Sequence, residues 1–539
     1  MRCWTGTTSN CHWGWGRSVD EVERRQVVVV GSGFGGAVAA CRLAQAGCDV
    51  LVLERGREYQ GNFPRDARDD WLWKGQHGPF DVRLLRGVNV VTAAGVGGGS
   101  LLYSNVHLRL PADGFGDRWP SGWSREELDP YYDVVSAMLH LRRACEDEAQ
   151  EHWPLPPKAG LLRGAADLLG ACKDVFHPPL AVDFGDPRYR WINEFGAEQS
   201  GCRHCGKCSV GCNFGAKNSL DKNYLPLAVR HGAVVRARCE VTALSREPGS
   251  GYRIVYRDHK LNTDTVVLAT TLVLAAGALG TTGLLLKHGE QLGDLSPMLG
   301  EHYSANGDYV TASLGVEKEW EPTRGPAITT SVLSDDGGTW FLVQDGGFPA
   351  FSVLDPETGV RPDRHDRALP VDDLTIQPGH VAILLAMGRD SATGRVRARR
   401  WCGDPLTVDW PTRENAAFYD AERDYLSDIG FALGEAGDVD PGRLTRVPVS
   451  VHSLGGAVMA DSPDMGVVDR HGEVFGAPGL YVLDGAAIPA ATGVNPSHTI
   501  AAVAERNAER LARLLIDDPG WTTPGLGTVP VYPDPLPVS

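Results

Sequence analysis

The sequence predicts an α/β fold in which a domain with a parallel sheet is split into separate stretches of the chain, with a second, α+β domain inserted between them. Three observations predict it. A strand, a glycine-rich turn, a helix and a second strand fit between residues 26 and 56. Apolar runs at 272–277 and 480–485 each end in glycine and would return the chain to the parallel sheet. Residues 301–450 hold shorter strand-like runs, which indicate a mainly antiparallel sheet.

The first of these units carries a pattern of glycines that favours a dinucleotide ligand. Residues 27–36 read VVVVGSGFGG, so a strand leads directly into a G-x-G-x-x-G turn. Gly31 permits the tight turn, Gly33 lets the backbone approach a pyrophosphate, and Gly36 lets the following helix pack closely on the strand. We therefore predict a Rossmann-like dinucleotide site at this turn.

The helix and the acidic residue that follow complete the pattern. A helix beginning near Phe34 would direct its free N–H groups toward a phosphate. Glu54 ends the next strand, where its carboxylate can accept hydrogen bonds from an adenosine ribose and disfavours a 2′-phosphate. Nicotinamide and flavin dinucleotides both use this pattern, so these residues alone leave the two open.

Size and charge argue against some function classes. The chain has 539 residues and a net charge of −16, and an acidic chain gains nothing from counterion release on DNA or RNA, so no nucleic-acid partner is expected. No run approaches about 18 apolar residues, so no transmembrane segment is expected. Residues 1–25 lack the apolar core of a secretory signal, from which we expect a cytoplasmic protein. The 12 cysteines are then expected to be thiols or ligands rather than disulfides.

The domain organisation follows from these patterns. We expect a loosely ordered leader at 1–25 and a tail at 516–539 whose prolines disfavour regular structure. The dinucleotide-binding domain is assigned to 26–130, 213–300 and 451–515, and a substrate-binding domain to 131–212 and 301–450. Residues 116–150 are expected to be mostly helical, because Ser124 and Glu127 have the spacing of a capping box.

Five separate motifs are spread in order over residues 26–510. They are the unit from Gly31 to Glu54, GVGGGSLLYSN at 95–105, LAAGALGTT at 274–282, HSLGG at 452–456, and the segment 481–504 with GVNP at 493–496. Together they resemble the motifs of the glucose–methanol–choline (GMC) flavoprotein oxidoreductases, and within that family the cholesterol-oxidase-like branch. No single motif would be specific, but their combination and order are.

The resemblance implies that the Rossmann-like domain binds FAD rather than NAD. The adenosine would lie at the end of the first βαβ unit, the pyrophosphate and flavin along the second glycine loop, and the ribityl or phosphate segment at the last strand. His107, shortly after the second glycine loop, is considered for a covalent link to the flavin, although no strong sequence evidence supports a link. The residues implied to contact FAD are Gly31, Gly33, Phe34, Gly36, Glu54, Gly95, Gly98, Asn105, Val241 (through its backbone, beside the adenine), Asp484 and Gly485.

The resemblance also implies a catalytic pair. Oxidation of an alcohol requires that the hydroxyl proton leave, and a neutral imidazole, with an ordinary pKa of about 6.5, suits that task. His452 is the candidate base, and Asn495 stands where the family has a second polar residue that holds the substrate oxygen. His498 could be mistaken for that residue, but the register of GVNP favours Asn495.

One position departs from the family pattern. Sterol oxidases that also isomerise their product use a glutamate in the substrate domain, and Gln344 stands at the matching position here. An amide cannot accept a proton at neutral pH, so we expect no double-bond isomerisation. Asp345 is adjacent but would point to the other face of an extended segment.

Four cysteines form a dense cluster outside these motifs. Cys202, Cys205, Cys208 and Cys212 have the spacing C-x2-C-x2-C-x3-C, which is that of a bacterial iron–sulfur loop, although Asn213 stands where a proline would follow. Three interpretations remain open: an iron–sulfur cluster that passes electrons to an external acceptor, a zinc site, or reduced thiols with no ligand.

Three functions are compatible with these residues. The first is FAD-dependent oxidation of a primary or secondary alcohol to the carbonyl, on a bulky apolar substrate such as a sterol, with oxygen, a quinone or a carrier protein as acceptor. The second is an FAD dehydrogenase of a sugar or polyol, with a non-oxygen acceptor and possible use of an iron–sulfur cluster. The third is a non-catalytic flavin or metal electron carrier, against which His452 and Asn495 argue because a carrier needs no base.

Overall fold

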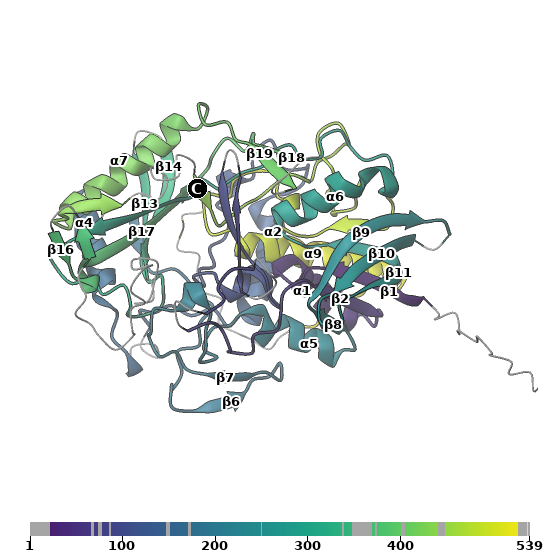
Figure 1. The fold of residues 1–539 in the computed structure, drawn as a ribbon, viewed down its shortest axis with the longest axis horizontal. Helices are drawn as coiled ribbons and strands as arrows, with labels where there is room; N and C mark the ends of the chain where they lie inside the picture. The colour runs from purple at the N-terminus through teal and green to yellow at the C-terminus, as the bar shows by residue number, and fades with distance from the viewer. Residues whose placement is uncertain are drawn as a thin grey trace, which may run out of the picture.

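This computed structural model describes residues 22–525 and residue 536, apart from 66–68, 74–77, 86–87, 147–150, 171–173, 250, 337–338, 348–368, 372–373, 400–404 and 440–447. Most of the expected leader, at 1–21, and most of the proline-rich tail, at 526–535 and 537–539, therefore lie outside the described residues. The predicted α/β fold with a second, antiparallel sheet is confirmed (Figure 1).

A seven-stranded sheet forms the Rossmann-like part of the molecule, on the right in Figure 1. Its order is β8-β2-β1-β11-β10-β9, and β22 pairs with the end of β11 beyond β10. The pairs β8–β2, β2–β1, β1–β11 and β11–β22 are parallel, whereas β9, β10 and β11 form an antiparallel meander. The strands are β1 (Glu23–Val30), β2 (Val50–Glu54), β8 (Val234–Ala237), β9 (Cys239–Glu247), β10 (Gly251–Asp258), β11 (Thr263–Leu274) and β22 (Leu480–Val482).

The strand at the centre begins earlier than the sequence pattern indicates. We expected the leader to extend to residue 25, but β1 starts at Glu23 and its first three residues pair with 267–269 of β11. Two of these three polar residues have their charges paired with neighbouring side chains. Glu23 binds Arg236 at 2.7 Å, and Arg25 binds Asp49 at 2.7 Å.

Helices cover this sheet and connect the stretches of the split domain. All residues from Gly35 to Ala44 of α1 are buried, since glycine and alanine let the helix pack between the sheet and its neighbours. α1 contacts α5 and α9, and α2 contacts α9. Ser124 caps α2 as predicted, accepting a hydrogen bond from the Glu127 N–H, but this helix ends at Met138, short of residue 150. The helices are α1 (Phe34–Gln45), α2 (Arg125–Met138), α5 (Tyr224–Arg230), α6 (Ala278–Leu292) and α9 (Ser497–Leu515).

A six-stranded antiparallel sheet forms the second part of the molecule, on the left in Figure 1. Its order is β20-β12-β17-β14-β13-β5, and α4 (Pro157–Leu168) and α7 (Ala416–Ala432) cover one face. Trp320 and Phe341 are buried in the apolar core between this sheet and the two helices. The strands are β5 (Val175–Phe176), β12 (Tyr309–Leu314), β13 (Ser331–Asp336), β14 (Thr339–Gly346), β17 (Val381–Gly388) and β20 (Gly437–Val439).

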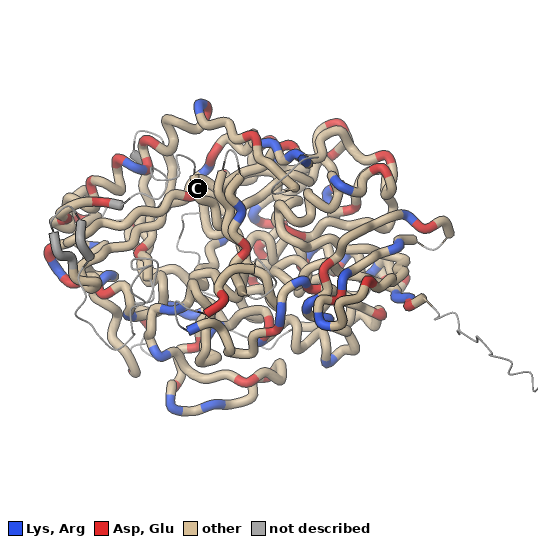
Figure 2. The backbone as a smooth tube through the Cα atoms, viewed as in Figure 1, with Lys and Arg blue, Asp and Glu red and all other residues tan. Residues whose placement is uncertain are grey.

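Smaller sheets complete the described strands. They are β3 (Phe80–Leu84) with β4 (Asn89–Ala93) and β21 (Val449–Ser450), β6 (Arg190–Ile192) with β7 (Glu198–Ser200), β15 (Leu369–Val371) with β16 (Leu374–Ile376), and β18 (Arg395–Ala398) with β19 (Leu406–Asp409). Acidic and basic residues are interspersed along the chain in both parts of the molecule (Figure 2). Within the described ranges, no helix combines the length and the apolar character needed to cross a bilayer.

Candidate active site

The first glycine turn has the tight packing that its sequence predicts. Gly31 has φ +96°, and a Cβ there would lie 2.3 Å from the Ala275 carbonyl oxygen at the end of β11. A Cβ on Gly36 would lie 2.1 Å from the carbonyl oxygen of Gly31. Side chains at these positions would therefore clash with backbone, which explains why both residues are glycine.

The second glycine loop lies directly against the first. Gly98 has φ +53° and begins the 3-10 turn η1 (Gly98–Leu101), and a Cβ there would lie 2.5 Å from the Cα of Gly33. Ser32 links the two loops because its hydroxyl accepts a hydrogen bond from the Gly97 N–H at 3.0 Å. Because Gly33 and Gly98 have no side chains, a pyrophosphate could approach the backbone of both loops closely.

Glu54 lies beside this junction, at the end of β2. Its carboxylate accepts hydrogen bonds from the Ser32 N–H and hydroxyl, at 3.1 and 2.7 Å, and from the Gly56 N–H at 2.8 Å. An ionised carboxylate can accept about four hydrogen bonds, so it retains capacity for a ribose hydroxyl. Phe34 follows this turn as the first residue of α1.

Asp484 joins the middle and C-terminal motifs beneath the same turn. Its carboxylate accepts hydrogen bonds from the Gly277 N–H at 2.8 Å, from the Thr281 hydroxyl at 2.6 Å, and from the Ala486 N–H at 2.8 Å. Burial raises the pKa of Asp484 to about 6. Gly485 begins the 3-10 turn η7 (Gly485–Ala487), which Asp484 caps.

Asn105 has the features of a ligand-binding residue. It is fully buried with φ +70°, and neither its side-chain oxygen nor its side-chain nitrogen has a hydrogen-bond partner among the described residues. Buried amides are ordinarily hydrogen-bonded. Asn105 also lines a cavity of about 230 Å³. This orphaned amide and the bare glycine junction fit a bound dinucleotide.

Two further predicted cofactor residues lie on the same part of the fold. Gly95 precedes η1, and its carbonyl accepts a hydrogen bond from the Gly98 N–H at 2.8 Å. Val241 lies in β9, opposite Tyr256 of β10 at a register shift, and β9 contacts β2. The contact of Val241 with an adenine stays a prediction.

His452 is held by a residue that the sequence analysis missed. Its Nδ1 lies 2.7 Å from Oδ1 of Asp308, while Oδ2 of Asp308 accepts the backbone N–H groups of Val451 and His452 at 2.7 and 2.9 Å. Asp308 is 3% exposed. Because an ionised carboxylate only accepts hydrogen bonds, it places the ring proton on Nδ1. The lone pair on Nε2 is then the one that can accept a proton.

A single turn before β12 brings this pair and the GVNP motif together. Asn306 accepts hydrogen bonds from the Thr492 and Gly493 N–H groups through Oδ1, and its Nδ2 donates to the Val494 carbonyl at 3.0 Å. Asp308 lies two residues later. The turn therefore fixes the loop that carries Asn495 relative to the imidazole of His452.

Asn495 and Gln344 form a pair of facing amides. Gln344 Nε2 donates to Oδ1 of Asn495 at 3.1 Å, and Asn495 Nδ2 lies 3.3 Å from Oε1 of Gln344. Asp345 points to the opposite face of β14, as predicted, where it binds Lys158 at 3.1 Å and the N–H groups of Thr329 and Thr330. The side chain beside Asn495 is thus an amide, which cannot act as a proton acceptor at neutral pH.

Gln344 also donates to the Ser331 hydroxyl at 3.0 Å, and an apolar cluster lies on the elements that carry the amide pair. Val494, next to Asn495, belongs to a buried cluster with Leu342 of β14 and Met387 of β17. Val106 and Leu108, which follow the second glycine loop, belong to the same cluster. The antiparallel sheet and the dinucleotide part therefore meet in an apolar layer next to the candidate catalytic residues.

The four cysteines of the predicted cluster line the cavity beside Asn105. In the part of the chain that the structure describes, which includes Cys202, Cys205, Cys208 and Cys212, no three His, Cys, Asp or Glu side chains are grouped to hold a metal ion. Burial raises the pKa of Cys205 to about 11 and raises that of Cys202 well above the ordinary value of a thiol. The iron–sulfur and zinc interpretations therefore have no support among the described side chains.

Lys217 links the cysteine segment to the second glycine loop through hydrogen bonds. Its ammonium group donates to the carbonyls of Leu101, Tyr103 and Cys208 at 3.0, 2.6 and 2.9 Å. These contacts give the segment a structural role as a cover over the loop.

The two other histidines considered from the sequence belong to the interior. His107 is 1% exposed, its Nε2 lies 3.0 Å from the Tyr103 hydroxyl, and burial lowers its pKa to about 3. Its ring packs edge-on against that of His498, which is also buried. His498 Nε2 bonds to the carbonyl of Tyr132, consistent with a structural role for this residue and with Asn495 as the family's polar position.

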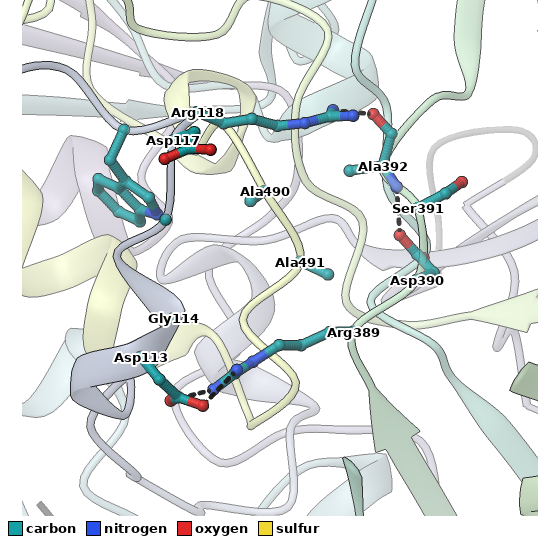
Figure 3. A pocket seen from close by; sticks show the side chains of 12 residues that line it. Asp113, Gly114, Asp117, Arg118, Arg389, Asp390, Ser391, Ala392, Ala490 and Ala491 are labelled. Atoms are coloured by element: carbon teal, nitrogen blue, oxygen red, sulfur yellow. Dashed lines mark hydrogen bonds and ion pairs between the residues drawn. The ribbon is translucent and has the colours of Figure 1, made fainter. Parts of the chain in front are cut away.

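A second cavity, of about 210 Å³, lies behind the loop that leads to GVNP (Figure 3). Ala490 and Ala491 border it between two arginines. Arg389 pairs with Asp113 through two hydrogen bonds of 2.8 and 2.7 Å, and Arg118 donates to the Ala392 carbonyl at 2.6 Å.

Comparison with known proteins identifies the family. Residues 191–302 and 436–504 match models described as GMC oxidoreductase, and residues 29–87 match a model of an NAD(P)-binding Rossmann-like domain. A cholesterol oxidase of Mycobacterium tuberculosis is 32% identical, over 89% of this chain and 90% of its own length. The chain belongs to the GMC oxidoreductase family. It is accordingly an FAD-dependent oxidoreductase that acts on alcohols.

The names of other similar proteins record cholesterol, paromamine or pyridoxine as the compound oxidised. A cholesterol oxidase of Acinetobacter baumannii is 28% identical over 89% of this chain and 93% of its own length. A paromamine 6′-oxidase of Streptomyces fradiae is 26% identical over 91% of this chain and 92% of its own length. A pyridoxine 4-oxidase from Mesorbium loti has a similar fold, with a TM-score of 0.61 and 19% identity over 90% of this chain and 99% of its own.

Proposed function

We propose that this GMC oxidoreductase oxidises a bulky, largely apolar alcohol such as a sterol, with His452 as the catalytic base. The observation that carries the base assignment is the bond from His452 Nδ1 to Asp308, because it leaves Nε2 as the proton acceptor. FAD, when bound, takes up the hydride from the carbinol carbon. The chain's own residues orient the alcohol and remove its proton.

The two sides of the site have different tasks. His452 Nε2 accepts the hydroxyl proton, and Asp308 stabilises the imidazolium that forms. Asn495 can donate a hydrogen bond from Nδ2 to the substrate oxygen, and Gln344 holds its carbonyl oxygen so that the amide keeps one orientation. His452 takes the proton while Asn495 holds the oxygen. The substrate hydroxyl is thereby oriented toward the base, as general base catalysis requires.

The apolar layer supports the choice of substrate class. Leu342 of β14 and Val494, which lie close in sequence to Gln344 and Asn495, belong with Met387 to one buried apolar cluster. The cholesterol oxidases among the relatives support the same class, as does a long-chain-alcohol oxidase of Arabidopsis thaliana that is 24% identical. Because Gln344 replaces a proton acceptor, we expect the product of a 3β-hydroxy-5-ene sterol to keep its unconjugated double bond.

Anaerobic flavin reduction tests this proposal. Purified enzyme is mixed with sterols, long-chain primary alcohols and polyols, and bleaching of the flavin bands is followed by stopped flow. Bleaching by sterols or long-chain alcohols supports the proposal. Bleaching by polyols alone would show that the substrate is a polyol and not an apolar alcohol. A conjugated enone from a 5-ene sterol would contradict the role given to Gln344.

His452→Ala tests the base. We expect the rate constant for flavin reduction to fall on the order of 10²–10⁴-fold while the variant keeps its yellow flavin, since the imidazole is not part of the predicted cofactor contacts. His231→Ala, at an exposed position at the end of α5, is the matched control and should reduce at the wild-type rate. Normal reduction in His452→Ala would remove the assignment.

A further inference from the structure

Strand β14 contacts the loop that carries the GVNP motif at two points. Trp340 and Gln344 lie four residues apart on this strand, so both side chains are on one face. Gln344 bonds to Asn495, as described above. A Cβ on Gly493 would lie 2.5 Å from Cζ3 and 3.2 Å from Cε3 of Trp340, so the ring packs directly against this backbone. The second contact is thus two residues before Asn495.

Arg389 packs against the same ring and the same glycine. It follows β17, whose last residue, Gly388, pairs with Phe341 of β14, so Arg389 and Trp340 are the next neighbours across the two strands. The central carbon of its guanidinium lies 4.8 Å from the centre of the Trp340 ring, within the range of a cation–π contact. A Cβ on Gly493 would also lie 3.0 Å from Cγ of Arg389. The arginine, the ring and the glycine therefore form one packed unit.

Asp113 binds the guanidinium of Arg389 from the dinucleotide side of the molecule. It lies on the 3-10 turn η2 (Ala112–Gly114), between the second glycine loop and α2. Its two carboxylate oxygens accept hydrogen bonds of 2.8 and 2.7 Å from the two terminal nitrogens of Arg389 (Figure 3). These bonds lower the pKa of Asp113, so the carboxylate is ionised at neutral pH.

This ion pair affects orientation more than stability. Its side chains are 26% and 53% exposed, and exposed ion pairs contribute little to the free energy of unfolding. A bidentate pair nevertheless sets the direction of the guanidinium. Asp113 thereby keeps Arg389 over the Trp340 ring.

We propose that Arg389 is a positioning residue that fixes the Asn495 amide for the substrate oxygen. Bound by Asp113, Arg389 keeps the Trp340 ring against the loop. The ring contacts Gly493, and this contact sets the position of the amide two residues later. This inference rests on the role proposed above for Asn495.

The proposed role determines which step depends on Arg389. Asn495 Nδ2 carries two hydrogens, one of which faces Oε1 of Gln344 at 3.3 Å, so the other is left for the substrate oxygen. That oxygen gains negative charge as His452 takes its proton, so the hydrogen bond is stronger in the transition state than in the bound alcohol. A displaced amide should therefore slow flavin reduction more than it weakens substrate binding.

Stopped-flow flavin reduction separates these two effects, with the sterol or long-chain alcohol that bleaches the flavin most strongly as substrate. Arg389→Met keeps the stem beside Gly493 but removes the guanidinium from Trp340. We expect the limiting rate constant to fall about 10-fold, while Kd for the alcohol changes less than about 3-fold. Trp340→Phe, which shortens the ring at Gly493, should give the same pattern. Arg389→Lys should not restore the rate, since an ammonium group makes neither the bidentate pair nor the planar contact.

A double-mutant cycle distinguishes positioning from general support of the fold. In Asn495→Ala no amide remains to be positioned, so adding Arg389→Met should slow reduction no further. If Arg389 only supported the fold, its loss would lower the rate by the same factor in both backgrounds. Arg397→Met, at an exposed ion pair with Asp409, is the matched control and should reduce at the wild-type rate.

Three results would overturn the inference. They are effects of Arg389→Met and Asn495→Ala that multiply, a wild-type rate constant in any Arg389 or Trp340 variant, and a change in Arg389→Met that is confined to Kd. If Asn495→Ala itself reduced at the wild-type rate, the proposed function of Asn495 would fail. If Asn495→Ala were slow and the two effects multiplied, only the role of Arg389 would fail.

Discussion

At the scale of single residues, the chemistry depends on which nitrogen of His452 carries the proton. Asp308 decides this through one carboxylate that is shared between the ring Nδ1 and two backbone N–H groups. The backbone bonds orient the carboxylate, and the carboxylate orients the ring. The position of the proposed base is therefore set by a buried residue that contacts the ring at Nδ1.

Asp308→Asn tests this arrangement. The two backbone N–H groups require an acceptor, so the amide oxygen should face them and the NH₂ should face His452 Nδ1. The imidazole would then carry its proton on Nε2 and could not accept another there. We expect the rate constant for flavin reduction to fall on the order of 10²–10⁴-fold, with flavin still bound. Asp409→Asn, in an exposed ion pair with Arg397, is the control, and equal rates in the two variants would contradict the role of Asp308.

The sequence could identify some of these residues and not others. His452 and Asn495 lie within motifs, and the alternation of an extended strand was enough to place Gln344 and Asp345 on opposite faces of β14. Asp308 lies 144 residues before His452 in no recognisable motif, so only the folded turn before β12 brings it to the ring.

At the scale of elements, the predicted cofactor site lies where turns from distant parts of the chain come together. The first turn follows β1, the second forms η1, and Asp484 links the turn after β11 to that before η7. Each glycine motif could be predicted from the sequence, because a turn with positive φ is a local property. The contact between Gly33 and Gly98 could not be predicted, because it depends on how distant loops are arranged.

Gly98→Ala tests this contact. The positive φ alone costs about 1–3 kcal/mol, and the added Cβ would meet the Cα of Gly33 at 2.5 Å, so the loops must separate. We expect the variant to be purified with much less flavin and to recover little when FAD is added, measured by the ratio of flavin to protein absorbance. Gly99→Ala is a closely matched control, because a Cβ at that adjacent glycine meets no heavy atom within 4 Å. Similar flavin loss in both variants would show that the Gly33 contact is not the cause.

At the scale of the whole molecule, the split domain is held together by a buried ion pair between its first and last helices. Arg42 of α1 binds Glu505 of α9 through Nε and a terminal nitrogen at 2.7 and 2.6 Å, across 463 residues of sequence. The Tyr224 hydroxyl of α5 donates to the same carboxylate at 2.6 Å. The fold class could be predicted from the order of the strands, but this pair could not, because a buried charge has no signature in local sequence.

Removing one partner of this pair should destabilise the protein more than removing both. In Arg42→Met the charge of Glu505 remains buried with only the Tyr224 hydroxyl beside it, and breaking such a pair costs about 3–5 kcal/mol. In the double variant Arg42→Met/Glu505→Leu no buried charge remains, so most of that loss should be recovered. Urea unfolding followed by tryptophan fluorescence measures both, with Arg513→Met, at a partly exposed pair with Glu509, expected to cost less than about 1 kcal/mol. If the effects of Arg42→Met and Glu505→Leu simply added, the helices would be held by apolar packing alone, and the ion pair would contribute no coupling between the two ends of the chain.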